Sequence, residues 1–135
     1  MAPRPLNRIL YVEDDPDIRA VAELALKDIA GYEVDLCCSG PEAVALARSI
    51  TPDLVILDIM MPGMDGIETF KRLREIPGLA TTPVVFMTAK AMQPEIGRYI
   101  SLGAAAVIPK PFDPLELPSQ IAEIWQRAWE DAALI

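Results

Sequence analysis

The residues best suited to chemistry in this chain stand where short apolar runs end. They are, in chain order, Glu13, Asp14, Asp58, Thr88 and Lys110. A single carboxylate at the end of a buried strand costs free energy unless it is paired or needed for a reaction. The carboxyl ends of parallel strands meet at one edge of a sheet, so we expect these side chains to share one crevice.

Asp58 has the setting of a nucleophile that accepts a phosphoryl group. A carboxylate nucleophile beside an ammonium and a hydroxyl suits formation of an aspartyl phosphate, in which Lys110 and Thr88 contact the oxygens of the transferred group. The plainer interpretation of Lys110 is a structural ion pair with one acid. Such a pair is compatible with the chemistry as its resting state.

The clustered acids predict a magnesium site. Carboxylates placed close together repel one another, and Mg²⁺ is a hard cation that typically binds one or two carboxylates, with water and phosphate completing its octahedron. Asp14 and Asp58 are the expected direct ligands. Glu13 is expected to act through water, and the backbone carbonyl of Met60 could complete the set.

The spacing of apolar residues predicts strands that alternate with helices. Asp15 before Pro16 has the form of a helix start, and Gly31 of a helix end. Five strand-like runs alternating with five helical runs predict a three-layer α/β domain with a parallel sheet. The predicted strands cover residues 9–13, 33–37, 53–58, 83–88 and 104–108. The first helix is expected to bury a stripe of Ile18, Val21, Ala22, Ala25 and Ile29.

The last helical run carries two tryptophans. Asp113 and Pro114 predict its start, and Pro118 lies too deep for the first turn, which predicts a bend or a restart there. Trp125 and Trp129 lie four residues apart on one stripe. Packing in the core is the favoured interpretation, and a partner or dimer surface that includes residues 128–135 is the alternative.

Length and composition fit one domain over residues 1–135, with its core at about 8–130. The chain is 52% hydrophobic and has no apolar run near the roughly 20 residues of a membrane span. The first eight residues lack the apolar stretch of a signal peptide, which predicts a cytoplasmic protein that does not engage a membrane. A net charge of −8 argues against binding nucleic acid.

Residue types also exclude several kinds of site. The chain has no histidine, which removes Ser-His and Cys-His nucleophile pairs. Its two cysteines, Cys37 and Cys38, are adjacent, which is poor geometry for an ordinary disulfide. Packing of both sulfurs is the expected role.

Four motifs in this order resemble the response-regulator receiver domain of two-component signalling. They cover residues 12–15, 57–66, 87–89 and 109–112, and the resemblance extends over roughly residues 8 to 130. It implies a doubly wound, flavodoxin-like sheet of order 2-1-3-4-5 flanked by five helices. It also implies phosphorylation of Asp58 by a histidine kinase or histidine phosphotransferase with Mg²⁺ required, and a Lys110–Pro111 bond that is often cis in relatives.

We therefore expect a stand-alone receiver that contacts a downstream protein or passes the phosphoryl group onward. It would be a monomer or weak dimer, and not an enzyme with a separate substrate. One position departs from the family. Val107 stands where relatives commonly carry Tyr or Phe, so the helix at residues 94–102, which contains Gly97, is expected to carry the response instead.

Met60 and Lys90, each two residues after a site residue, are expected to tune the lifetime of the phosphoryl group, with Met60 hindering the hydrolytic water.

Other functions fit the residues less well. A haloacid-dehalogenase-like phosphatase needs a second aspartate two residues after the nucleophile, where this chain has Met60. A flavodoxin-like cofactor site needs a phosphate-binding loop after the first strand, where the acids would repel phosphate. A degenerate receiver that only mediates contacts is the remaining alternative, and Asp14, Asp58, Thr88 and Lys110 all being present argues against it.

Overall fold

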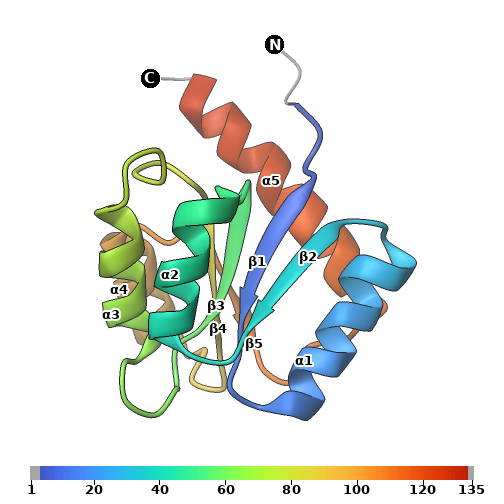
Figure 1. The fold of residues 1–135 in the computed structure, drawn as a ribbon, viewed down its shortest axis with the longest axis horizontal. Helices are drawn as coiled ribbons and strands as arrows, with labels where there is room; N and C mark the ends of the chain where they lie inside the picture. Colours follow the sequence, from blue (N-terminus) through green and yellow to red (C-terminus); the bar gives the residue numbers. More distant parts are fainter. Residues whose placement is uncertain (1–3, 134–135) are drawn as a thin grey trace.

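A parallel five-stranded sheet forms the middle layer of the computed structural model, which describes residues 4–133. Its order is β2-β1-β3-β4-β5, with helices on both faces (Figure 1). The predicted doubly wound α/β fold is thereby confirmed. The strands are β1 (Arg8–Val12), β2 (Glu33–Cys37), β3 (Leu54–Asp58), β4 (Val84–Thr88) and β5 (Ala106–Pro109).

The central strand β3 delivers Asp58 to the edge of the sheet. Every residue of β3 and of its neighbour β4 is buried, as expected for strands covered on both faces. In the parallel register, Val12 pairs with Leu57 and Asp58 pairs with Met87. The strands therefore end together at one edge of the sheet, here named the carboxyl edge; the opposite edge is the amino edge.

Two hydrophobic clusters attach the helices to the sheet. One face is covered by α1 (Pro16–Glu23), the π-helix η1 (Leu24–Ile29) and α5 (Leu117–Ala133). The other face is covered by α2 (Gly40–Ile50), α3 (Gly66–Arg74) and α4 (Gln93–Leu102). Within residues 4–133, no helix has the length and apolar character needed to cross a membrane.

Short polar side chains begin three of the helices. Asp15 accepts hydrogen bonds from the N–H groups of Asp17 and Ile18 at the start of α1, as its pairing with Pro16 predicts. Ser39 and Asp65 cap α2 and α3 in the same way. These caps set where the chain leaves the carboxyl edge.

The first helix differs from its predicted form. The expected stripe assumed one α-helical period, but the helix continues from Leu24 as a π-helix. Ile29, at the end of the π-helix, is 61% exposed, and Val21, which precedes it, is 39% exposed, whereas Ala22 and Ala25 are buried. A widened turn shifts the face that follows it, so only part of the predicted stripe reaches the core.

The prediction that the last helix starts at Asp113 is wrong. A turn at residues 114–116 precedes α5, which begins at Leu117 with its N–H donating to the Asp113 carbonyl. Pro118 therefore lies in the first turn, where its missing N–H leaves no bond unmade. The described residues 110–116, between β5 and Leu117, form no helix, so neither the predicted bend nor the predicted restart at Pro118 occurs. Strand β5 likewise starts at Ala106 and not at Ala104.

The cysteines also differ from expectation. Cys37 is buried and Cys38 is exposed, so only the first packs as predicted.

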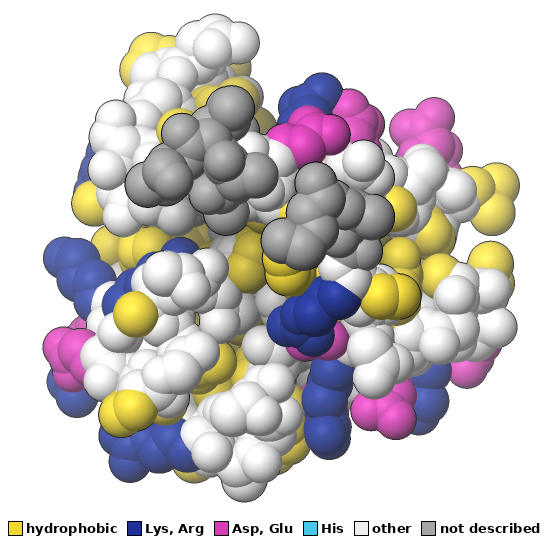
Figure 2. All heavy atoms as spheres, turned by 90° about the horizontal axis from the view of Figure 1, so that it is seen from above, with side chains coloured by type: hydrophobic (Ala, Val, Ile, Leu, Met, Phe, Trp, Pro, Cys, Tyr) yellow, Lys and Arg dark blue, Asp and Glu magenta, His cyan; other side chains and the backbone are white. Residues whose placement is uncertain are grey.

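The tryptophans lie at the amino edge of the sheet, beside Asp53 and Pro83. Figure 2 shows the molecule from the side of this edge. Trp125 is 6% exposed, and its indole N–H donates to the Arg4 carbonyl at 2.8 Å. The Arg4 guanidinium lies over the Trp125 ring and pairs with Asp53 at 2.7 Å. Packing in the core is thus confirmed for Trp125. Trp129 contacts it edge-to-face and is only partly buried. The end of the proposed partner surface, residues 134–135, lies outside the described residues.

Candidate functional site

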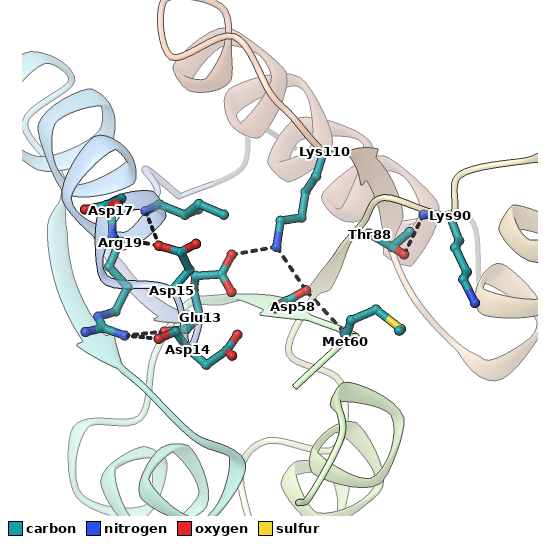
Figure 3. Close-up of polar contacts among 11 residues, drawn as sticks. Glu13, Asp14, Asp15, Asp17, Arg19, Asp58, Met60, Thr88, Lys90 and Lys110 are labelled. Carbon is teal, nitrogen blue, oxygen red and sulfur yellow. Dashed lines mark hydrogen bonds and ion pairs between the residues drawn. The ribbon is translucent and has the colours of Figure 1, made fainter. Parts of the chain in front are cut away.

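Acidic and basic side chains predicted to share a crevice do meet at the carboxyl edge. Oxygens of Glu13, Asp14 and Asp58 all lie within 4.8 Å of one another. The Lys110 ammonium lies between two of them, 2.7 Å from Glu13 Oε1 and 3.3 Å from Asp58 Oδ1 (Figure 3). The ion pair expected for the resting state is present.

Burial shifts the pKa values of the charged groups in this cluster. Glu13 is 1% exposed and Asp58 is 2% exposed, while Asp14 is the most exposed of the three acids. Burial, together with the neighbouring Asp58, raises the pKa of Glu13, although the attraction of Lys110 opposes that rise. For Lys110 itself, burial alone would lower the pKa, but the hydrogen bond to Glu13 and the charge of Asp58 outweigh it, and the pKa is raised.

One oxygen on each buried acid has no partner. Glu13 Oε2 and Asp58 Oδ2 are buried and make no hydrogen bond within the described part of the chain. An unpaired buried carboxylate oxygen is costly, and a hard cation is a suitable partner for several such oxygens at once. The donor set therefore fits Mg²⁺: Asp14 and Asp58 would hold it directly and Glu13 would hold it through water.

The loop after β3 is held close to Asp58 by its own backbone. The N–H of Met60 donates to Asp58 Oδ1 at 3.3 Å, and the N–H of Gly66 donates to the Ile59 carbonyl at 2.9 Å. A side chain on Gly66 would collide with the backbone of Asp58 and Ile59. Glycine is therefore required for this close approach. The predicted metal-ligand role of the Met60 carbonyl stays a prediction.

Thr88 ends β4, beside β3, and is fully buried. Its hydroxyl accepts a hydrogen bond from the N–H of Lys90 at 3.0 Å, which ties the next loop to it. Lys110 follows β5, and its peptide bond to Pro111 is cis, as the resemblance implied. The site residues thus come from the ends of β1, β3, β4 and β5.

One residue of the site was missed from sequence. Arg19, on α1, donates from Nη1 to the carbonyl oxygens of Glu13 and Asp14, at 2.8 Å and 3.0 Å (Figure 3). Asp15 lies between β1 and α1 and caps the helix. Among the described residues, its carboxylate is not part of the cluster that Glu13, Asp14 and Asp58 form. The signal available in the sequence was a basic residue four positions after the capping acid.

Comparison with known proteins agrees with this site. A family model for the response regulator receiver domain matches residues 9–122. The chain belongs to this family.

Solved and curated relatives support the assignment. The structure of the Vibrio cholerae chemotaxis protein CheY4 aligns with a TM-score of 0.82 at 31% identity, covering 89% of this chain and 99% of CheY4. Response regulator Rre1 of Synechocystis is 36% identical over 119 residues, which are 88% of this chain and 52% of Rre1. The DNA-binding response regulator MtrA of Mycolicibacterium smegmatis is 33% identical over 127 residues, 94% of this chain and 54% of MtrA. This chain therefore spans about half the length of these two curated relatives.

Proposed function

We propose that the chain is a phosphorylatable receiver that takes a phosphoryl group onto Asp58 from a histidine kinase or histidine phosphotransferase in the cytoplasm. The observation that carries the proposal is the set of converging groups at the carboxyl edge. Lys110 contacts both Glu13 and Asp58, and one oxygen on each of these acids is buried without a partner. A purely structural cluster would be expected to satisfy those oxygens.

The residues divide the work of phosphoryl transfer. An Asp58 oxygen attacks the phosphorus of the donor phosphohistidine, the phosphorus–nitrogen bond breaks, and its electron pair returns to the imidazole. Lys110 stabilises negative charge on the transferred group, and the Thr88 hydroxyl, which accepts from the Lys90 N–H, donates its own proton to one of the phosphoryl oxygens. Mg²⁺, held by Asp14 and Asp58, would neutralise charge on the phosphoryl oxygens. No separate substrate is turned over.

An apolar cavity beside the site suits docking of a phosphodonor protein. It has a volume of about 470 Å³ and lies next to Lys110. Ile18 and Val21 of α1 and Phe112 after β5 contribute apolar lining. A protein partner that covers this surface would bring its phosphohistidine to the edge of the sheet and exclude water. The net charge of −8 argues against nucleic acid as the partner of these residues.

Incubation with acetyl phosphate and Mg²⁺, followed by intact mass measurement, tests the chemistry. We expect a single phosphate adduct on the wild-type chain. No adduct should form when EDTA is added before acetyl phosphate, and none should form on Asp58→Ala. Absence of any adduct on the wild-type chain would favour the alternative of a receiver that acts only through contacts.

We infer that α4 carries the response to phosphorylation. Val107 has no ring to move, whereas Tyr99 of α4 is buried and stacks edge-to-face on Phe86 of β4 at 5.6 Å. Gly97 in the same helix lowers its intrinsic stability by about 1 kcal/mol relative to Ala. Amide exchange measured with and without a phosphoryl mimic should change across residues 88–103. Unchanged protection there would contradict this route.

Met60 is proposed to lengthen the life of the aspartyl phosphate. Its side chain is 57% exposed beside Asp58, where it obstructs an approaching water. The aspartyl phosphate of Met60→Asn should therefore hydrolyse faster than that of the wild type. Intact mass measured over time follows the loss of the phosphate adduct. An equal rate would count against the proposal.

A further inference from the structure

Arg19 is a cation placed against an acidic cluster without forming an ion pair. Its Nη1 atom donates to the backbone carbonyls of Glu13 and Asp14 (Figure 3). Among the side chains that the structure describes, those of residues 4–130, no carboxylate lies within ion-pair distance of its guanidinium. Arg19 therefore contacts the backbone carbonyls of these acids and not their carboxylates.

The charge of Arg19 works against a metal in the neighbouring cluster. A fixed positive charge near a site repels an incoming dication, so on electrostatics alone this residue would weaken Mg²⁺ binding. Its hydrogen bonds have the opposite effect. They hold the two carbonyls that follow the end of β1, beyond the last bond of the sheet, in which the Glu13 N–H donates to the Cys37 carbonyl at 3.0 Å.

Asp14 depends most on this support. In the described part of the chain, no hydrogen bond or ion pair holds its carboxylate, and it is the most exposed of the three acids. Its position is set by its backbone, and that backbone is held by Arg19. The backbone of Arg19 is itself fixed next to this segment, because its N–H donates to the Asp15 carbonyl at 3.0 Å in the first turn of α1.

We propose that Arg19 is a positioning residue for the magnesium site, holding the backbone of Glu13 and Asp14 so that the Asp14 carboxylate faces Asp58. This rests on the proposed function, in which these acids bind Mg²⁺. Partners that orient metal ligands commonly change metal affinity by about 10- to 100-fold when they are removed. A guanidinium suits this task, since one nitrogen carries two hydrogens for two carbonyls.

Isothermal titration of the full chain with Mg²⁺ separates the two effects of Arg19 by their sign. Arg19→Met removes the charge and the hydrogen bonds at similar side-chain length. We expect the dissociation constant for Mg²⁺ to rise about tenfold. Arg127→Met is the matched control, because it removes the same charge from an exposed pair with Glu123 on α5. Its Mg²⁺ affinity should equal that of the wild type.

Equal or tighter binding by Arg19→Met would overturn the proposal, because only the charge would then matter. If that variant does not fold, Arg19→Gln decides: it removes the charge and is too short to hold both carbonyls, so several-fold weaker binding supports the proposal and equal or tighter binding overturns it. A wild-type chain that binds no Mg²⁺ would overturn the proposed function together with this inference. Wild-type binding with an unaffected Arg19→Met overturns the inference alone.

Discussion

The two edges of the sheet each pair a basic side chain with an acid, the partly buried Asp53 at one edge and the buried Asp58 at the other, and they satisfy that acid differently. At the amino edge, Asp53 accepts from Arg4 through one oxygen and from the N–H groups of Asn7 and Arg8 through the other. At the carboxyl edge, Lys110 contacts one oxygen of Asp58 and leaves the second buried without a partner. The first arrangement is complete, and the second has room for another ligand.

This difference separates stability from function. A buried carboxylate with all its hydrogen bonds contributes to the fold, whereas one left partly unsatisfied costs free energy that a reaction or a bound ion can offset. Asp53 thus ties the N-terminal segment to the sheet and to Trp125. Asp58, at the other end of β3, keeps one buried oxygen without a partner and so has room for a further ligand.

The sharpest test exchanges each acid for its amide. Asp58→Asn should abolish the phosphate adduct completely, because the amide is not a nucleophile for phosphorus. Asp53→Asn should form the adduct as the wild type does, since it lies at the opposite edge. Intact mass after treatment with acetyl phosphate measures both. Loss of the adduct in Asp53→Asn would break the separation of the two edges.

Removing Lys110, which contacts both Glu13 and Asp58, should lower the free energy of unfolding. Lys110→Met leaves Glu13 and Asp58 as neighbouring buried acids without a cation, so the free energy of unfolding in EDTA should fall by about 3 kcal/mol. Added Mg²⁺ should stabilise this variant more than the wild type. Urea denaturation measures both effects, with the exposed Lys71→Met as control. Equal stability of Lys110→Met and wild type in EDTA would contradict this account.

The amino edge should show the opposite behaviour. Asp53→Ala removes an acceptor of charge-assisted hydrogen bonds, so the free energy of unfolding should fall by about 2 kcal/mol, with or without Mg²⁺. Asp28→Ala, at an exposed position on η1, is the control and should change little. A destabilisation of Asp53→Ala that Mg²⁺ reverses would show that the two edges are coupled.

The smallest expected effect concerns pH. Burial, with a contribution from Asp58, raises the pKa of Glu13 above its ordinary value of 4.5, so the folded chain binds this proton more tightly than the unfolded chain does. The stability that protonated Glu13 contributes is therefore present below pH 4.5 and is lost as the pH rises through the folded-state pKa. Unfolding measured in EDTA across this range should show the loss in the wild type and not in Glu13→Gln. Parallel pH profiles would contradict it.

Much of the fold could be predicted because its signals are local. Asp15, Ser39 and Asp65 cap helices through bonds to residues two or three positions away, which a sequence displays directly. The π-helix that ends at the exposed Ile29 was missed, because periodicity assumes one helical pitch. The late start of α5 was missed because Asp113 and Pro114 also suit a turn.

The sequence pattern by itself determined which residues end the strands, whereas the strand order was implied by the resemblance to a known family. Apolar runs that stop at Glu13, Asp58, Thr88 and Lys110 must place those groups at one edge once the strands are parallel. Which oxygens find partners was decided only by the tertiary structure. Arg4 meets Asp53 and Trp125 across long stretches of chain, and the position of Arg19 four residues after Asp15 does not by itself specify the two carbonyls that it reaches. Hydrogen bonding depends on positions to within fractions of an ångström, and packing sets those positions.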